Sequence, residues 1–517
     1  MSVDGSRDHF ASADRVDAEE LTHFGYRQVL RRTMGLGRST MVNISTSSVT
    51  TAMFTLFAFG LLTGGTAFIW TYAVGFAILL LVTICFSELG SNMPIAGALY
   101  PWASRLVGPR YGYAVGWLYV AAQTAICAAV AYGIAPFVAS LFNWSITANE
   151  QATVAVVIIV LSTMVNLVGI SVASGISAVG AVAEVVGMLV IVAVLIVTGI
   201  GNQPVEVLFK SEGLAPGGGF LSVALATMLF GSWAYTGLEM TTDMAEETHE
   251  APRVIPRAAL TSICTTFGVG MIFLIVSVLA IPSIGGVFES ENPLQAIIEG
   301  NTSSGFYDAT LVVVIVAVFV ATVTNQALTA RALFSLARDR KFPASGTVET
   351  VPKSTRVPAV AIVIVGILAS ALLLFTNAIG VIAVACLTAL FACYMLVVWG
   401  QLYARLRGDW EPTHWTVGRM SLPINVLAAV LGTALTINIA WPRGEAIWYE
   451  RWSGWVFTGG VLLCALIYYL VGGRKARAAI DAHPAALGIA PHHHPELATS
   501  PAMAAAPESP TTPESVE

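Results

Sequence analysis

The chain has 517 residues, of which 56% are hydrophobic and only 11% are charged, and its mean hydropathy is +0.76. This balance excludes a soluble globular domain and indicates that the lipid bilayer is the main solvent. The net charge of −6, without a basic stripe along the sequence, argues against nucleic acid as a partner.

The first 38 residues are polar and acidic and contain no early apolar core, so they are not a signal peptide and are expected to form a cytoplasmic N-terminal tail, 1–38. Apolar runs of about 20 residues follow, each long enough to cross roughly 30 Å of hydrocarbon. We predict helices at 39–62, 66–90, 111–141, 151–170, 175–200, 219–243, 257–281, 306–336, 357–376, 379–403, 420–441 and 452–471. The expected fold class is an all-α polytopic membrane protein with about 12 transmembrane helices.

These helices divide the chain into regions. Residues 39–200 hold the first five helices, 201–403 hold an extracellular loop and the next five, and 404–473 hold helices 11 and 12. Residues 474–517 are rich in Ala, Pro, Ser, Thr and Glu, a composition typical of a disordered cytoplasmic tail. Three adjacent histidines in this tail, His492, His493 and His494, are more typical of a solvated segment than of a metal site, so we predict no metal.

Positive charges indicate the orientation. With a cytoplasmic N-terminus and twelve spans, only Lys210, Arg443 and Arg451 lie outside, and the other 22 of the 25 lysines and arginines lie inside. Cytoplasmic loops of membrane proteins carry such an excess. We therefore predict a multi-pass protein of the cytoplasmic membrane with both termini in the cytoplasm.

Helix 1 carries a polar run at the expected mid-membrane depth, in which seven of the nine residues from Asn43 to Thr51 have polar side chains. Scattered Ser and Thr residues bond back to the preceding turn at little cost. A cluster favours an unwound segment whose following half-helix aims its N-terminus at an anionic group. The candidate substrate-binding residues here are Ser47, Ser48, Val49 and Thr50.

Helix 6 contains a second predicted break, where Gly and aromatic residues replace good helix formers. A carboxylate inside an apolar span costs about 2.5 to 3.5 kcal/mol on insertion scales, so Glu239 should face a cavity or a partner. It either caps a half-helix or meets a substrate ammonium group, and the aromatic rings either pack or form one wall of a small-amine site. The candidate substrate-binding residues are Trp233, Ala234, Tyr235, Gly237 and Glu239.

The two breaks open two blocks of five helices each. A block with an odd number of spans must be inverted when it is repeated, so the breaks would meet near the midplane on opposite sides of a pseudo-two-fold axis. This arrangement predicts transport by alternating access.

Glu184 lies in an otherwise apolar stretch of helix 5. It either carries the coupling proton of a symporter or makes a purely structural hydrogen bond to helix 1 or helix 8. We expect a proton as the coupling ion and no cofactor, with Na⁺ held by serine or backbone oxygens as the alternative. Gln123 in helix 3 and Asn325 in helix 8 are further polar residues expected to line the path.

Two motifs carry a resemblance to a known family. Glu88, Leu89, Pro94, Gly97 and Tyr100 follow the pattern E-L-x(4)-P-x-x-G-x-x-Y after helix 2. The second motif is the segment from Tyr235 to Glu239, which continues into Ala245-Glu246-Glu247 and Pro256-Arg257-Ala258. It is similar to the pattern G-[FY]-[DE]…A-E-E…P…P-R-A.

Over about residues 25–475 the chain resembles the amino acid, polyamine and organocation transporter superfamily, in the branch that includes GABA and choline permeases. The resemblance implies a 5 + 5 inverted repeat with broken helices 1 and 6, and two peripheral helices, 11 and 12. The chain departs from many members at Ser47, Ser48 and Val49, where they have a G-[ST]-G triplet, so hydroxyl groups are expected to replace or supplement backbone amides.

The acidic pair Glu246 and Glu247 precedes Arg253 and Arg257, and the four residues form either a cytoplasmic gate or a solvated ion network. Hydroxyl groups at the first break suit a carboxylate, and Glu239 suits an amine. We therefore expect a secondary active transporter, not an enzyme, that imports an amino acid or a GABA-like zwitterion. The alternatives are a permease for choline, a polyamine or another organic amine, and an amino acid exchanger. The sequence makes no prediction about the oligomeric state.

Overall fold

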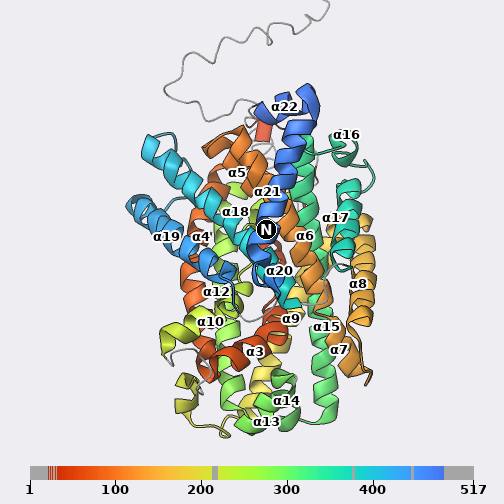
Figure 1. Ribbon diagram of the computed structural model, residues 1–517, viewed down its shortest axis with the longest axis vertical. Helices are drawn as coiled ribbons and strands as arrows, with labels where there is room; N and C mark the ends of the chain where they lie inside the picture. The colour runs from red at the N-terminus through yellow and green to blue at the C-terminus, as the bar shows by residue number, and fades with distance from the viewer. Residues whose placement is uncertain are drawn as a thin grey trace, which may run out of the picture.

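The computed structural model describes residues 21, 22, 24, 26, 30, 32–211, 219–290, 292–374, 379–443 and 447–482. This part of the chain is helical, and the only β-pairing within it is an isolated parallel bridge between Met34 and Thr248 (Figure 1). Most of the predicted tail 1–38, and residues 483–517 of the predicted tail 474–517, lie outside the described residues.

The first five predicted helices are present. Helix 1 is divided into α2 (Leu36–Ser47) and α3 (Val49–Gly64), and it is followed by α4 (Ile69–Asn92), α6 (Pro109–Tyr132), α7 (Ala135–Leu141), α8 (Ala148–Val168) and α9 (Ile170–Thr198). The predicted span 111–141 is present as one apolar segment, Pro109–Leu141, but within it α6 ends at Tyr132 and α7 begins at Ala135. Pro136 in the first turn of α7 explains the interruption, since its ring clashes with the carbonyl four residues earlier and it has no N–H to donate.

The second five follow as α10 (Phe220–Trp233) with α11 (Met240–Asp243), α12 (Ala251–Leu279), α15 (Ser304–Arg338), α17 (Ala359–Leu372) and α18 (Ile379–Arg407). The last two spans are α19 (Ser421–Ala440) and α21 (Ser453–Val471). Among the described residues, ten helical segments are long and apolar enough to cross a membrane, and α10 and α17 are two shorter apolar helices. Together they account for the twelve predicted spans.

Short helices cover the two ends of the bundle. In Figure 1 one end carries α5 (Leu99–Leu106), α16 (Ser345–Val348) and α22 (Gly473–Asp481), and we name it the α5 face. The opposite end carries α13 (Ile284–Glu289) and α14 (Pro293–Asn301), and we name it the α14 face.

The helix α22 corrects the predicted start of the disordered tail at residue 474. Ile480 is fully buried in a cluster with Tyr113 and Ala465, and Asp481 accepts a hydrogen bond of 2.7 Å from Nε of Arg110. The buried Ile480 side chain anchors this short helix, whose other residues are charged or small, to α6 and α21, and overall composition did not reveal that anchor.

The packing of the core follows the inverted repeat. Each of the first four helices of one block packs on its equivalent in the other: α2 on α11 and α3 on α10, then α4 on α12, α6 on α15 and α8 on α17. Contacts between equivalent helices are what a two-fold axis through the core produces. The helices α19 and α21 pack against α18 from outside these blocks, as expected for peripheral spans.

Glu88, the acid of the E-L motif, joins the repeat to these outer elements. Its buried carboxylate pairs with Arg405 of α18 and accepts hydrogen bonds from Trp410 Nε1 at 3.0 Å, Thr416 Oγ1 at 3.0 Å and Ser421 Oγ at 2.7 Å. A buried carboxylate is stable only when it is paired and hydrogen-bonded in this way. The motif's acid therefore holds α4, α18 and α19 together.

Candidate functional site

The break in helix 1 is a single residue wide. Ser48 has φ +34° and ψ +89°, a left-handed conformation that ends α2 and starts α3. Its hydroxyl oxygen accepts a hydrogen bond from the backbone N–H of Thr51 at 3.3 Å, which caps the new helix. Val49 and Thr50 form the first turn of α3, and all of these residues are buried.

The group that occupies this half-helix N-terminus is the carboxyl group of Glu184, from the chain itself. One oxygen of the Glu184 carboxyl accepts a hydrogen bond from the Thr50 N–H at 2.8 Å and another from the Ser48 hydroxyl at 2.9 Å. The positive end of the α3 dipole and a free backbone donor both favour a negative charge there. Of the two interpretations of Glu184, contact with helix 1 is thus observed, and it involves the predicted anion-binding end.

The break in helix 6 spans the residues between Trp233 and Met240. Gly237 lies in this segment with φ +80°, and a Cβ atom there would lie 2.4 Å from the Thr46 side chain. Ala234 ends α10, and Glu239 immediately precedes α11 but makes no capping hydrogen bond with its side chain. Glu239 therefore occupies the N-cap position of α11, as one interpretation expected, but its side chain does not supply the cap.

The Glu239 side chain instead accepts hydrogen bonds from residues of the third span, α6, and the tenth span, α18. Its Oε1 accepts from the Tyr119 hydroxyl at 2.7 Å and from Nε2 of Gln123 at 2.6 Å, and its Oε2 accepts from the Tyr394 hydroxyl at 2.5 Å. The Tyr394 oxygen in turn accepts the Gly237 N–H at 3.1 Å. The structure thus places Gln123 beside Glu239 and surrounds the carboxylate with donors.

The two breaks contact each other. The Ser47 hydroxyl donates to the carbonyl of Thr236 at 3.2 Å, and Asn325 Nδ2 donates to the carbonyl of Thr46 at 3.4 Å. Asn325 therefore connects helix 8 to the first break. Residues about 190 positions apart in the sequence form one region, as the inverted-repeat geometry predicted.

An aromatic group flanks the second break. The Tyr235 ring lies 4.9 Å from that of Tyr72 and 6.1 Å from that of Phe76, measured between centroids, and its hydroxyl donates to the carbonyl of Tyr72 at 3.1 Å. Phe267 stacks on Phe76 at 4.1 Å. Trp233 is also buried. These rings form a wall that suits an organic cation or an apolar side chain.

The breaks are closed off at the α5 face by buried ion pairs. Arg331 Nε lies 2.6 Å from Glu247 Oε1, with side chains 3% and 2% exposed, and Arg338 Nη1 lies 3.0 Å from Glu246 Oε1. The predicted partners were wrong: Arg253 lies 3.8 Å from Glu250 and Arg257 is exposed. The arginines that pair with the acidic loop come from α15, the eighth span. The arginines close to the loop in sequence, Arg253 and Arg257, are exposed on α12.

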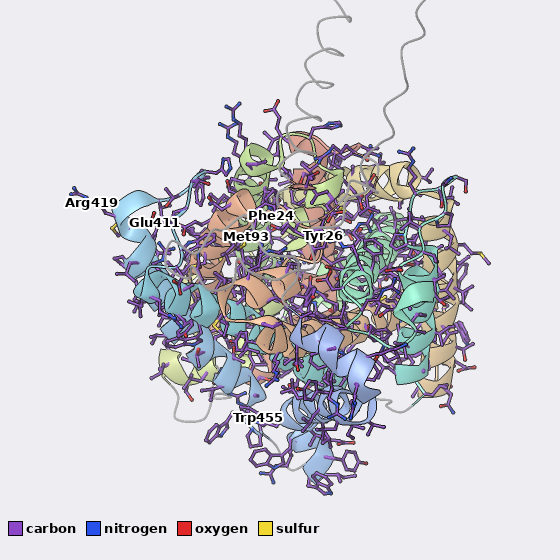
Figure 2. The ribbon with its side chains drawn as sticks, turned by 90° about the horizontal axis from the view of Figure 1, so that it is seen from above. Phe24, Tyr26, Met93, Glu411, Arg419 and Trp455 are labelled. Carbon is purple, nitrogen blue, oxygen red and sulfur yellow. The ribbon has the colours of Figure 1, made fainter. Side chains whose placement is uncertain are left out.

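Described residues near the N-terminus lie beside these ion pairs. Figure 2 shows Phe24 and Tyr26 near the middle of the α5 face, while Glu411 and Arg419 lie at its edge. The Arg338 guanidinium lies 3.9 Å from the centroid of the Tyr26 ring. The Met34 carbonyl also accepts the His249 N–H at 2.9 Å and its N–H donates to the Glu247 carbonyl at 3.0 Å, so Met34 is attached to the acidic loop.

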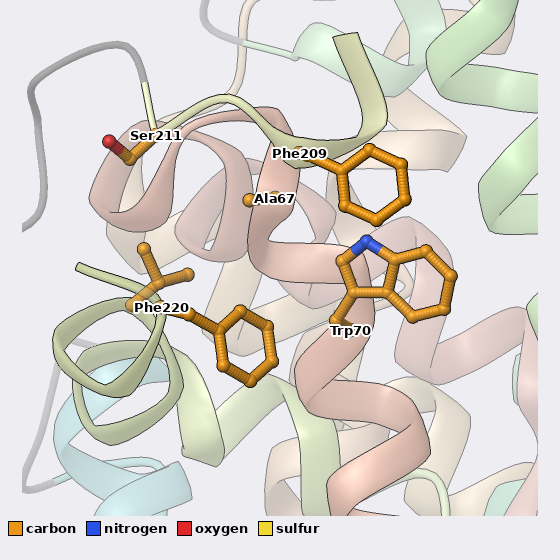
Figure 3. Close-up of a pocket in the computed structure, with 6 residues that line it drawn as sticks. Ala67, Trp70, Phe209, Ser211 and Phe220 are labelled. Carbon is orange, nitrogen blue, oxygen red and sulfur yellow. The ribbon is translucent and has the colours of Figure 1, made fainter. Parts of the chain in front are cut away.

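A separate cavity of about 440 Å³ opens near the start of α4, where Trp70 stacks on Phe209 at 5.3 Å (Figure 3). Its other lining residues are Ala67, Ser211, Phe220 and Val223. No residue of the predicted site lines this cavity.

Sequence reasoning missed Tyr119 and Tyr394 as partners of Glu239. Tyr119 precedes Gln123 by four residues and shares its helix face, so the helical period alone could have found it. Tyr394 had no such signal, because its place beside the second break depends on how helix 10 packs.

Comparison with known proteins supports the same class. The amino acid permease family model matches residues 39–441. An uncharacterised amino-acid permease of Schizosaccharomyces pombe is 23% identical, with 88% of each chain covered, and the thiamine transporter thi9 of the same yeast is 24% identical over 90% of this chain and 88% of its own. The amino-acid permease BAT1 of Arabidopsis thaliana is 26% identical over 63% of this chain and 68% of its own. The chain thus belongs to the amino acid permease family and is a multi-pass membrane transporter, not an enzyme.

Proposed function

We propose that this transporter imports an amino acid or a GABA-like zwitterion by alternating access, driven by a proton that Glu184 carries. The observation that supports this most directly is that the Glu184 carboxyl accepts hydrogen bonds from the Thr50 N–H and the Ser48 hydroxyl. A substrate carboxylate would seek the same helix N-terminus.

This shared position provides a coupling mechanism. Two carboxylates cannot both occupy one helix N-terminus, because like charges in a low-dielectric site repel strongly. Protonation of Glu184 removes its charge and weakens its hold on the α3 donors, which frees them for the substrate carboxylate. The proton and the substrate then bind together, as symport requires.

The amine end of the substrate would face the second break. Glu239 provides negative charge there, and the rings of Tyr235 and Tyr72 provide an apolar wall. The distance between the two ends then selects for substrate length, which distinguishes an α-amino acid from a GABA-like zwitterion.

Alternating access in this proposal uses the ion pairs at the α5 face, which we take to be cytoplasmic because the predicted basic loops lie there. Separation of Glu247 from Arg331 and of Glu246 from Arg338 would open the path to the cytoplasm. The protein would act in the cytoplasmic membrane with both termini inside.

A second candidate is a permease for an organic cation without a carboxylate. Occupation of the α3 N-terminus by Glu184 favours it, since such a substrate would leave Glu184 in place and use only Glu239 and the aromatic wall. One relative is a thiamine transporter. Choline or a polyamine would fit the same chemistry, and an amino acid exchanger would use the zwitterion site without Glu184 as a proton carrier.

The test is uptake into proteoliposomes of labelled GABA, neutral and basic amino acids, choline, putrescine and thiamine, with an imposed pH or sodium gradient. We expect one zwitterion to accumulate on the pH gradient. The Glu184→Gln variant should lose accumulation while it still exchanges substrate across the membrane, and Glu299→Gln, on the short helix α14, is the control.

The results separate the candidates. Accumulation by Glu184→Gln on a pH gradient would refute Glu184 as the proton carrier. Uptake of a cation alone, insensitive to Glu184→Gln, would favour the second candidate. Counterflow without accumulation in the unaltered protein would make it an exchanger, and accumulation on sodium alone would replace the proton as the coupling ion.

A further inference from the structure

Two carboxyl groups, one in the second break and one at the end of α11, share one phenol. Asp243 lies one helical turn after Glu239, and both are fully buried. The Tyr119 oxygen lies 2.7 Å from Glu239 Oε1 and 2.5 Å from Asp243 Oδ2. Both distances are those of O–H···O hydrogen bonds.

Counting protons shows that one acid is neutral. Each of the two oxygen pairs needs a hydrogen between its atoms, and the Tyr119 hydroxyl has only one. The second hydrogen must come from a carboxyl group. Either Glu239 or Asp243 therefore donates to the Tyr119 oxygen as a protonated acid.

The surrounding donors identify which acid it is. Glu239 Oε1 also faces Gln123 Nε2, which can only donate, and protonation of Oε2 would deprive the Tyr394 hydroxyl of its acceptor. Both oxygens of Glu239 thus accept, as an ionised carboxylate does. Asp243 Oδ1 is buried and has no hydrogen bond of standard geometry among the described residues, with the Gly97 backbone near the carboxyl group. An orphaned oxygen is far less costly on a neutral acid than on a carboxylate.

Nearby charges agree with this assignment. The cation that acts on Asp243 is Arg331, and its guanidinium is already engaged by both oxygens of Glu247 and by the Ala327 carbonyl. The other groups that face the two acids are the Tyr394 hydroxyl and the Cys393 thiol of α18, which carry no positive charge. Arg331 therefore has no free charge to balance a second carboxylate beside Glu239.

We propose that Asp243 holds a proton in this closed state, in the chain Asp243–COOH···Tyr119–OH···⁻OOC–Glu239. One transfer along the chain moves the carboxyl hydrogen of Asp243 to the Tyr119 oxygen while the Tyr119 hydrogen passes to Glu239. The products are an Asp243 carboxylate, an intact Tyr119 phenol and a neutral Glu239, so charge and atoms balance. Asp243 and Tyr119 thereby set the charge that Glu239 presents to a substrate amine.

This proton site is distinct from Glu184, which lies on α9 at the first break. The assignment rests only on hydrogen bonds among the chain's own residues, so it stands whether the transported molecule is a zwitterion or a cation. Its failure and the failure of proton symport through Glu184 are therefore separate results.

The experiment is infrared spectroscopy of the protein in lipid bilayers at neutral pH, which detects the carbonyl stretch of a protonated carboxyl group. A Glu184→Gln background removes any contribution from that buried acid. We expect Asp243→Asn to abolish one carboxylic-acid band, because the Asn amide can donate to Tyr119 in place of the acid and leave Glu239 ionised. Asp308→Asn, at an exposed position on α15, should leave the band unchanged.

A second variant tests the chain if Asp243→Asn fails to fold. Tyr119→Phe removes the acceptor of the Asp243 proton, so the band should shift to higher frequency. A band of unchanged intensity in Asp243→Asn, or of unchanged frequency in Tyr119→Phe, would overturn the proposal.

Discussion

Replacement of Arg331 by Met tests how the α5 face stays closed. The Arg331 guanidinium makes two hydrogen bonds to Glu247, at 2.6 and 3.0 Å, and one to the Ala327 carbonyl at 2.7 Å. Arg331→Met keeps the apolar stem but leaves the Glu247 carboxylate buried without a counter-charge. Removal of one partner from a buried pair costs about 3 to 5 kcal/mol, and each 1.4 kcal/mol is tenfold in an equilibrium constant. The closed state should therefore become less favoured by roughly a hundredfold to a few thousandfold.

The assay is labelling of a cysteine introduced at Ser47 by a reagent that cannot cross membranes, in a background without the six native cysteines. The reagent is supplied at the side of the α5 face, and the labelling rate reports how often the path opens. Arg340→Met is the matched control, because Arg340 pairs with Glu349 at 2.7 Å but the two side chains are 56% and 27% exposed. Exposed pairs contribute about 0 to 1 kcal/mol.

We expect Arg331→Met to accelerate labelling strongly and Arg340→Met to leave it nearly unchanged. Replacement of both Arg331 and Glu247 by apolar residues should restore much of the closed state, because no charge is then left unpaired. Equal labelling rates in the two single variants would refute the argument that burial gives the Arg331 pair its strength.

Two further predictions concern backbone geometry and pH. Gly237→Ala should reduce transport by roughly fivefold to a hundredfold, because φ is +80° and the new Cβ would lie 2.4 Å from Thr46, and such strain costs about 1 to 3 kcal/mol. Gly268→Ala, with open space around the new Cβ, should have no such effect on uptake. Burial lowers the pKa of Lys341 to about 8, so the unfolded chain binds more protons than the folded one between pH 8 and the ordinary lysine value of about 10.4. The unfolding midpoint should rise with pH across that window, and Lys341→Met, compared with Lys353→Met on the loop before α17, should abolish the rise.

Much of the fold was predictable because a transmembrane span is a local property. Each helix must satisfy its own backbone hydrogen bonds in lipid, so apolar length alone identifies it. The structure departs from the predicted helices where one residue outweighed composition. Pro136 interrupts helix 3, and Ile480 anchors a helix in a segment that composition assigned to a disordered tail.

The positions of both breaks were also predictable, because they depend on local helix propensity. The polar cluster before Thr51 and the Gly237 segment each favour non-helical backbone without help from other elements. Their partners were not predictable in the same way. The sequence offered the nearby Arg253 and Arg257 as partners of Glu246 and Glu247, in a gate or a solvated ion network, whereas Arg331, 84 residues away, supplies the observed pair with Glu247.

The sequence by itself therefore determined the class of protein, the number of spans and the two places where the helices break. Tertiary structure decided which groups meet there: Glu184 on the α3 N-terminus, and Tyr119 between Glu239 and Asp243. The physical reason is the separation along the chain of the groups that each interaction joins. Burial of apolar side chains and backbone hydrogen bonding act within one helix, whereas the pairing of buried polar groups depends on distances of about 3 Å between helices far apart in the chain.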